Sequence, residues 1–388
     1  MKLPGKAVLA GPGSSLSRSN LTTPLSPVQK ACRSAIAEEL ESLRRFRKNG
    51  GLVLGFLCSG FPEALAAGLG FRPLRLISGY TDDAMNKGVM RLRPDVCPMI
   101  LSFLGGVLDG TEPFSLVDLW IGLSTCDQTR RCFSLLEDSE SVFTVHLPAT
   151  RTDAAGKYYA GQLEDFVARA GSITGMSYSE SRALRYVHEK ATAAALLRKA
   201  VASGAISPLD IHWMLHLYHV SDPSGLEERI GSILELAGEY RPRLITGISG
   251  SPMVSEDVHA LRAIQDNGAG VVPLGCTGLL PLQRMEAAAD SACADPVSLA
   301  LSSFESLRCP RSRPNDQLFS YLNGSLEQYG CAGLIIKCLK FCDLWYAERQ
   351  RFKDRIQLPV MVMDTSYGPG EALRQQGRID AFLETLEE

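Results

Sequence analysis

Short apolar runs alternate with stretches whose apolar positions recur at helical spacing along most of the chain. In the first half this pattern predicts four buried strands and three helices: strands 52–57, 74–77, 117–123 and 142–147, and helices 63–67, 96–106 and 127–137. Strands that alternate with helices are typical of parallel sheets. The pattern therefore predicts a first α/β domain over residues 51–156.

The same order of elements returns toward the C-terminus. Here the pattern predicts four further strands and three helices: strands 243–247, 270–274, 333–337 and 359–363, and helices 254–266, 343–356 and 371–387. Gly268 stands where a glycine commonly ends a helix, directly after the helix at 254–266. We therefore predict a second α/β domain over residues 241–388.

The remaining segments are predicted to lie outside the two sheets. Residues 27–50 carry apolar positions at helical spacing and form a helical arm. Residues 157–240 begin with a long helical stretch over 157–203 and form a helical layer that connects the domains. Residues 1–26, rich in Gly, Ser and Pro, are predicted to be a mobile tail. The predicted fold is α/β, with an N-terminal helical arm and two doubly wound Rossmann-like parallel-sheet domains.

Composition excludes several classes of protein. The chain is 45% hydrophobic and 21% charged, which is ordinary for a globular protein. Its net charge of -3 argues against binding to nucleic acid or to an anionic membrane surface. No apolar run is long enough to span a bilayer, and the first residues lack the sustained apolar core of a signal peptide. We expect a cytoplasmic protein.

The 11 cysteines carry the candidate chemistry. An odd count without a secretory signal argues against a disulfide framework, and Cys32, Cys132 and Cys293 are interpreted as small buried residues. Three others stand at predicted junctions of strands and helices: Cys97, Cys126 and Cys342. Such corners can converge outside the carboxyl ends of parallel strands. Three converging thiolates suit an iron–sulfur cluster that keeps one iron open.

Other metal sites are less favoured by the residues. His212, His216 and His219 have a spacing that could bind a metal, but the apolar residues around them favour a packed amphipathic helix. Cys338 lies four residues before Cys342, and the two side chains need not meet if Cys338 is still on the strand. The C-x-x-C runs of ferredoxins and zinc ribbons are absent, as are a P-loop and a G-x-G-x-x-G fingerprint.

A small-residue turn supplies a further candidate. Residues 248–252 follow a predicted strand and precede a predicted helix, so N–H groups and the Ser251 hydroxyl can face an anion or a carbonyl. The alternative is that Ser251 only caps the helix. The residues leave both interpretations open.

Several short motifs occur in a fixed order along the chain: Gly55-Phe56-Leu57-Cys58-Ser59, Pro62-Glu63-Ala64-Leu65, Cys97-Pro98, Thr125-Cys126-Asp127, Gly250-Ser251-Pro252, Gly275-Cys276-Thr277-Gly278 and Phe341-Cys342-Asp343. In these motifs the chain resembles the 2-hydroxyacyl-CoA dehydratase and benzoyl-CoA reductase family of iron–sulfur proteins. The similarity runs from about residue 30 to the C-terminus, and the length is closer to the smaller, beta-type subunits.

The resemblance implies a radical-type hydro-lyase. A [4Fe-4S] cluster would be held by Cys97, Cys126 and Cys342, while Ser251 and Ser59 would contact an acyl-CoA substrate. A low-potential electron from an ATP-dependent iron–sulfur activator would generate a ketyl radical, from which water is eliminated. The resemblance also implies a dimer, with either a homologous second subunit or an identical chain.

Additional thiols keep other functions open. Cys58, Cys276, Cys309 and Cys338 lie near predicted strand ends or loops, and Cys58 and Cys338 are secondary candidates as metal ligands. A branch of the same family carries a double-cubane iron–sulfur cluster and reduces small molecules. Further alternatives are a benzoyl-CoA reductase-like enzyme, a cluster-carrying electron-transfer component, and a cluster-free relative that binds a partner.

Overall fold

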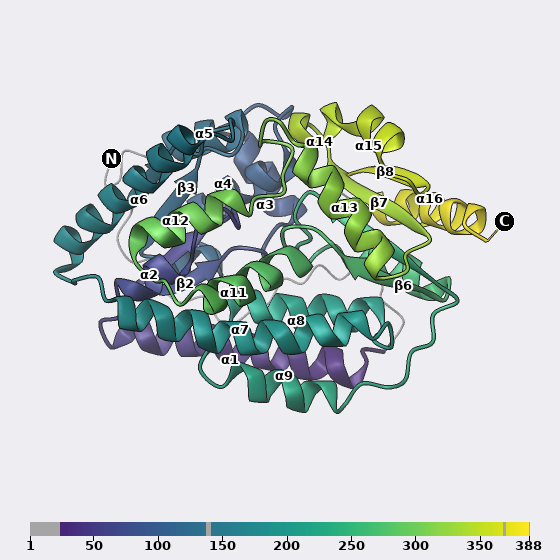
Figure 1. Cartoon of the computed structure of the whole chain (residues 1–388), viewed down its shortest axis with the longest axis horizontal. Helices are drawn as coiled ribbons and strands as arrows, with labels where there is room; N and C mark the ends of the chain where they lie inside the picture. Colours follow the sequence, from purple (N-terminus) through teal and green to yellow (C-terminus); the bar gives the residue numbers. More distant parts are fainter. Residues whose placement is uncertain (1–23, 137–140, 368–369, 388) are drawn as a thin grey trace.

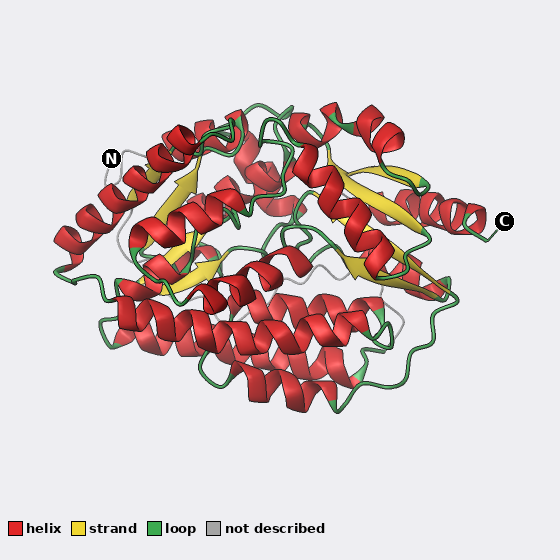
Figure 2. Ribbon diagram, in the orientation of Figure 1, coloured by secondary structure: helices red, strands yellow, loops and turns green. Residues whose placement is uncertain are grey.

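A computed structural model describes residues 24–136, 141–367 and 370–387 of the chain. Two separate parallel sheets stand at opposite sides of the molecule, with a layer of long helices below them (Figures 1 and 2). The α/β fold with two doubly wound, Rossmann-like sheets is thus as predicted. Of the predicted mobile tail, residues 1–23 lie outside the described residues.

The first sheet contains four parallel strands in the order β2-β1-β3-β4. Its strands are β1 (Val53–Phe56), β2 (Arg72–Arg75), β3 (Leu119–Leu123) and β4 (Val142–Val145). Leu54 pairs with Leu119 of β3 and, through its other edge, with Pro73 of β2. Because β1 and β3 are central and covered on both faces, all of their residues are apolar or glycine.

The second sheet repeats this arrangement in the order β6-β5-β7-β8. Its strands are β5 (Leu244–Gly250), β6 (Ala269–Pro273), β7 (Gly333–Leu339) and β8 (Val360–Thr365). In each sheet the chain first runs to one side of the central strand and then to the other. The topological switch point therefore lies between β1 and β3 in the first sheet and between β5 and β7 in the second, and ligands bind at the carboxyl ends of such points.

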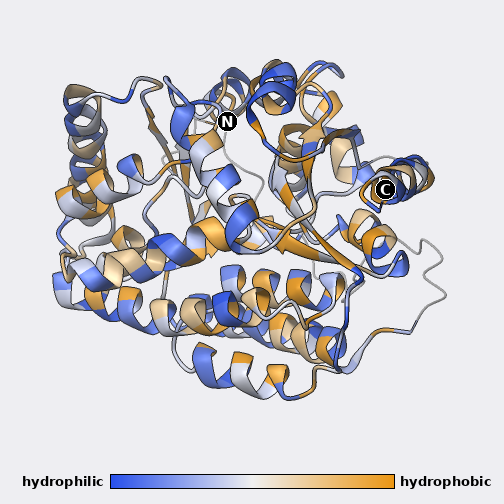
Figure 3. Ribbon diagram, turned by 45° about the vertical axis from the view of Figure 1, so that its right-hand side comes forward, coloured by the Kyte–Doolittle hydropathy of each residue, from blue (hydrophilic) through white to orange (hydrophobic). Residues whose placement is uncertain are grey.

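Helices cover both faces of each sheet. On the first sheet, α2 (Ala64–Gly68), α6 (Asp153–Thr174) and α12 (Pro296–Glu305) pack on one face, and α4 (Pro98–Asp109) and α5 (Asp127–Ser134) on the other. On the second sheet, α10 (Val258–Asp266) and α16 (Glu371–Thr385) oppose α8 (Pro208–Val220) and α13 (Asp316–Gln328). Figure 3 shows mostly apolar strands and helices that carry both colours, as expected for elements between core and solvent.

A helical layer connects the two halves. It contains α1 (Pro27–Lys48), α7 (Glu180–Ala202), α8 and α9 (Leu226–Leu234), which lie side by side in Figure 1, and α11 (Leu279–Ser291) packs against α7. All thirteen residues of α8 are buried because other elements surround it. The predicted amphipathic character of this helix is therefore wrong.

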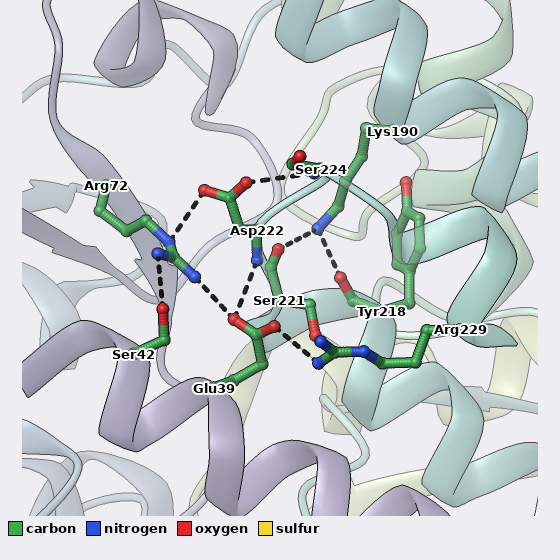
Figure 4. A network of polar contacts seen from close by, with 9 residues as sticks. All are labelled: Glu39, Ser42, Arg72, Lys190, Tyr218, Ser221, Asp222, Ser224 and Arg229. Atoms are coloured by element: carbon green, nitrogen blue, oxygen red, sulfur yellow. Dashed lines mark hydrogen bonds and ion pairs between the residues drawn. The ribbon is translucent and has the colours of Figure 1, made fainter. Parts of the chain in front are cut away.

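Ion pairs tie the arm to the first sheet and to the helical layer (Figure 4). Glu39 of α1 forms ion pairs with Arg72 of β2 at 2.6 Å and with Arg229 of α9 at 2.8 Å. Arg72 also pairs with Asp222 at 3.0 Å. Glu39 and Arg72 are largely buried, so their charges compensate each other away from water. This network fixes the connection from α8 to α9.

The buried Lys190 of α7 holds the end of α8 from the other side (Figure 4). Its ammonium group donates to the carbonyl oxygen of Tyr218 and, at 3.0 Å, to that of Ser221. These carbonyls stand at the C-terminus of a helix, where a cation is favourable. The position of His219 on the last turn of α8 is set in this way.

Several boundaries differ from the prediction. Residues 157–203 form parts of two helices, because Gly175 ends α6 in the left-handed conformation. The helix predicted at 343–356 is two helices, α14 (Asp343–Ala347) and α15 (Arg349–Arg355), and the one predicted at 254–266 begins only at Val258. Helices α3 (Asp82–Val89), α11, α12 and α13 were not predicted. None of the described helices is long and apolar enough to cross a membrane.

Candidate functional site

Three helices begin with a cysteine at the N-cap position. Cys97 precedes α4, Cys126 precedes α5 and Cys342 precedes α14. The Cys126 sulfur accepts the N–H of Thr129 at 3.4 Å, as a capping group does. The free N–H groups of a helix N-terminus favour a negative charge, and hence a thiolate. We call Cys97, Cys126 and Cys342 the corner cysteines.

The corner cysteines interact electrostatically with one another. Burial raises the pKa of Cys97 to about 12, and the neighbouring charges of Cys342 and Cys126 add to the shift. Burial also raises the pKa of Cys342, with a further contribution from Cys126. The charges of Cys342 and Cys126 thus disfavour ionisation of Cys97, and the charge of Cys126 disfavours ionisation of Cys342, so forming these thiolates together requires a compensating positive charge.

One side chain joins the segments that carry the corner cysteines. Gln128, two residues after Cys126, accepts the main-chain N–H of Cys97 at 2.6 Å. Its amide nitrogen donates to the carbonyl oxygen of Phe341 at 2.8 Å, directly before Cys342. Phe341 has a φ of 60°, a left-handed conformation that costs a non-glycine residue roughly 1–2 kcal/mol. Sequence reasoning missed Gln128, whose one signal is its position beside a candidate ligand.

Ser251 lies next to Cys342. Gly250 before it has a φ of 119°, and a Cβ there would stand 2.0 Å from the Lys337 carbonyl oxygen, so the close approach of β5 to β7 requires glycine. The Ser251 hydroxyl accepts the N–H of Leu339 at 3.2 Å, and its hydrogen bond to Cys342 lowers the pKa of that thiol against the effect of burial. Helix α10 begins at Val258, so the interpretation of Ser251 as a helix cap is wrong.

Three further thiols form a second cysteine group: Cys58, Cys276 and Cys309. Burial raises the pKa of Cys309 to about 12, and charges on Cys58, Cys276 and Cys342 contribute. Cys58 follows β1, and its sulfur accepts the N–H of Gly60 at 3.2 Å. The sequence analysis named these thiols together with Cys338 as additional thiols, but it did not predict that the three lie near one another. The second cysteine group lies close enough to Cys342 for the two sets to interact electrostatically.

Arg311 connects the Cys309 loop to the Cys126 corner. Its guanidinium donates to the carbonyl oxygen of Thr125 at 3.0 Å and, through Nε, to that of Leu147 at 3.1 Å. Burial lowers the pKa of Arg311, whereas the thiols of Cys309 and Cys126 raise it. Arg311 thus places a positive charge near cysteines of both sets.

The other cysteines lie apart from these sets or inside the core. Cys338 is fully buried within β7, and its sulfur lies 4.0 Å from the Cys342 carbonyl oxygen. Cys32 and Cys132 are fully buried, as interpreted from the sequence. Cys293 is exposed, so its interpretation as a buried residue is wrong. Cys293 lies in the short connection between α11 and α12, where its side chain is open to solvent.

The histidines of α8 are core residues. Arg75 is always protonated and donates to Nδ1 of His219 at 3.3 Å, so Nε2 carries the proton and donates to the Thr277 carbonyl oxygen at 3.1 Å. Both ring nitrogens are therefore used. Burial lowers the pKa of His212 to about 4 and that of His216 to about 3, which keeps both neutral at pH 7.

A single metal ion finds no ready site. In the part of the chain that the structure describes, no three His, Cys, Asp or Glu side chains are arranged to hold one ion. Sulfurs around one tetrahedral zinc stand only about 3.8 Å apart, since each Zn–S bond is about 2.3 Å long. A four-iron cubane bridges wider gaps. The wider spacing of a cubane is the reason the cluster stays a proposal that this finding does not test.

Ser59, the remaining candidate, follows Cys58 at the end of β1. Its carbonyl oxygen accepts the guanidinium of Arg284 at 2.6 Å, and the residue lines a cavity between the first sheet and α11. It therefore lies beside the second cysteine group, whereas Ser251 lies beside the corner cysteines.

Comparison with known proteins gives a consistent result. The family model described as 2-hydroxyglutaryl-CoA dehydratase, D-component, matches residues 58–386, which include all three corner cysteines. The chain is also 22% identical over 360 residues to a protein of Escherichia coli (strain K12) described as "Putative dehydratase subunit YjiM". That match covers 88% of this chain and 93% of the other protein.

Proposed function

The chain belongs to the 2-hydroxyglutaryl-CoA dehydratase D-component family, and from this membership we propose that it is the iron–sulfur subunit of a dehydratase acting on 2-hydroxyacyl-CoA thioesters. Membership of a dehydratase family supports an enzyme of the lyase class. The observation that carries the finer proposal is the arrangement of the corner cysteines, each at a helix N-terminus and all joined through Gln128.

We propose that Cys97, Cys126 and Cys342 hold a [4Fe-4S] cluster. When bound, such a cluster supplies the low-potential electron that makes elimination of water through a ketyl radical of the substrate feasible. The protein contributes three thiols, of which Cys97 is 8% exposed, and N–H groups that hydrogen-bond each of them. Burial of this kind excludes water and oxygen from a reactive centre.

Ser251 is proposed to act on the substrate beside the cluster. Its hydroxyl lies at the carboxyl end of β5, beside Cys342. The residue is only 3% exposed. A hydroxyl fixed in a buried site can stabilise the negative charge that develops on a thioester carbonyl. Ser59 is proposed as a second contact, on the side of the second cysteine group.

The description of the family as a D-component implies a partner subunit. We propose that this partner is a homologous subunit or an identical chain, and that electrons arrive from an ATP-dependent iron–sulfur activator. Sedimentation of the anaerobic protein should then show a dimer, or a complex once the homologous subunit is added. A fully active monomer would contradict this part of the proposal.

The function is tested by an anaerobic dehydration assay. The chain, a candidate partner, an activator, ATP and a reductant are mixed with a 2-hydroxyacyl-CoA, and the enoyl-CoA product is quantified. Product should form with the wild type and should fall to background with Cys126→Ala, whereas Cys132→Ala should remain active. Equal activity of both variants would overturn the proposal.

The second cysteine group favours one alternative, a double-cubane-cluster reductase of small molecules. The charge of Cys276 raises the pKa of Cys58, and the charges of Cys58, Cys276 and Cys342 raise that of Cys309, which favours one larger cluster held by the two sets. Iron analysis separates the two functions, because roughly four iron atoms per chain fit one cubane and roughly eight fit two. Loss of half the iron in Cys309→Ala would favour the reductase.

A further inference from the structure

A cavity beside the Cys58–Ser59 turn contains an unusual concentration of positive charge. It opens between α2, α7, α11 and α12, and its polar lining comes from seven side chains besides His219: Ser59, Glu63, Arg75, Arg284, Ser302, Ser303 and Ser306. Ser302 is exposed, so this wall reaches solvent and a small ligand can enter.

Arg75 reaches the cavity from the end of β2. It is only 2% exposed, and its Nη1 is occupied by His219 at 3.3 Å. Its Nη2 is buried and has no hydrogen-bond partner among the described residues. A buried guanidinium with an unused N–H group is costly, because the group has lost its water without gaining a protein acceptor.

Arg284 reaches the cavity from α11. Its Nη groups donate to the carbonyl oxygen of Ser59 at 2.6 Å and to the Ser303 hydroxyl at 2.5 Å, which fixes the plane of the guanidinium. Its Nε is buried and has no partner among the described residues. Burial lowers the pKa of Arg284, and the nearby charge of Arg75 lowers it further.

Neither guanidinium belongs to an ion pair within the described part of the chain, although buried charges in proteins are normally paired. Glu63 also lines the cavity, but its carboxylate is hydrogen-bonded to Tyr186. Two buried guanidinium groups with unused donors therefore face one accessible cavity whose lining contains a single carboxylate, that of Glu63, so one positive charge is left unmatched.

We propose that this cavity binds a compact oxyanion of carboxylate size. Guanidinium N–H groups form charge-assisted hydrogen bonds with carboxylates, and the unused groups on Nη2 of Arg75 and Nε of Arg284 can donate to such a ligand. The Ser59 and Ser302 hydroxyls can add neutral donors. The inference goes beyond the proposed dehydratase, because it concerns anion recognition and its test requires no turnover.

The binding test uses the full chain, purified anaerobically, in titration calorimetry with acetate and with acetamide, its uncharged isostere. Acetate should bind and acetamide should not, because only the carboxylate supplies the missing negative charge. Sulfate distinguishes two sources of the same chemistry: competition with acetate supports a general oxyanion site, and acetate binding that sulfate leaves unchanged supports a carboxylate site. Equal heats for acetate and acetamide would overturn the proposal.

Variants locate the bound acetate. Arg284→Gln should weaken acetate binding about 10- to 100-fold. Arg198→Gln is the matched control. Arg198 of α7 pairs with Glu286 of α11, the helix that carries Arg284, and it does not line the cavity. Unchanged affinity in folded Arg284→Gln would contradict the assignment.

A second pair of variants tests the site without touching either arginine. Ser302 is exposed, so its replacement should leave the fold intact. Ser302→Glu places a carboxylate where it can compete with the ligand and should reduce acetate affinity at least about 10-fold, while the equally large Ser302→Gln should not. Identical affinities in the two variants would overturn the proposal.

Discussion

β3 of the first sheet and β7 of the second occupy corresponding places in their sheets, and in each case a cysteine is the third residue after the strand. Cys126 and Cys342 both cap the next helix, and each is followed by an aspartate in its first turn. The corners after the other two central strands, β1 and β5, differ from each other. Cys58 follows β1, whereas Ser251 follows β5.

This difference teaches how two similar sheets build one asymmetric site. The shared corner supplies a thiol from each half of the molecule, and α4 adds Cys97 as the third. At the second sheet, Ser251 hydrogen-bonds the thiol of its neighbouring corner. At the first sheet, Cys58 instead joins the second cysteine group. Mutations can test both the equivalence of the shared corners and the distinct role of Ser251.

The largest effect is expected from the shared corners. If Cys126 and Cys342 are equivalent ligands, Cys126→Ser and Cys342→Ser should each lose most of the iron after anaerobic reconstitution with iron and sulfide. Cys32→Ser is the control, because Cys32 is buried in the helical layer, away from both sets. Retention of wild-type iron by either corner variant would break the equivalence.

Ser251→Ala tests the corner that differs. Loss of a buried donor to a developing charge should lower turnover about 10- to 1000-fold while the iron content stays normal. Because the Ser251 hydrogen bond lowers the pKa of Cys342, its loss should also slow alkylation of Cys342 at fixed pH in metal-free protein. Ser249→Ala, equally buried on the same strand, should do neither. Unchanged turnover would remove Ser251 from the site.

Gln128→Ala tests whether the two halves are held together at the site. Removal of a side chain that bridges Cys97 and Phe341 should cost about 1–3 kcal/mol of unfolding free energy and should accelerate loss of iron. Gln162 of α6 is the control, because it bridges the N–H and the carbonyl oxygen of a single residue, His146, and not the segments of the corner cysteines. Iron loss that is equally fast in Gln162→Ala would show a general effect on stability.

Glu256 gives the last prediction, on stability as a function of pH. Its carboxylate accepts the N–H of Gly79 and so connects the loop after β5 to the loop after β2 of the first sheet. Burial raises its pKa from 4.5 to about 7. The unfolded chain therefore binds fewer protons than the folded chain between these values, so stability should fall as pH rises from about 4.5 to 7, by at most about 1.4 kcal/mol per pH unit.

The variant Glu256→Gln should flatten this dependence, as measured by denaturant unfolding at several pH values. The exposed Glu305→Gln is its control. A slope that is the same in Glu256→Gln and in the wild type would assign the pH dependence to other groups.

The sequence predicted what local patterns determine. Alternating apolar runs gave both sheets, and a cysteine directly after such a run marked Cys126 and Cys342, because the strand and its corner are contiguous in sequence. The break at Gly175 and the late start of α10 depend on capping contacts that periodicity does not contain. The full burial of α8 could not be predicted either, because it results from elements distant in sequence.

The supporting contacts of the site were equally out of reach. Gln128 acts across 213 residues to Phe341, and Arg311 acts across 186 residues to Thr125. Residue type alone does not reveal such partners. The grouping of Cys58, Cys276 and Cys309 likewise appears only once the loops after β1, β6 and α12 are brought together.

The most direct test of the central claim is the iron and sulfide content of the full-length chain, reconstituted and reduced anaerobically, together with its electron paramagnetic resonance spectrum. We predict roughly four iron and four sulfide per chain in one cubane, with a spectrum of a reduced iron–sulfur cluster that is lost in the triple variant Cys97→Ser, Cys126→Ser, Cys342→Ser. A triple variant that keeps the iron, the sulfide and the spectrum of the wild type would contradict the account.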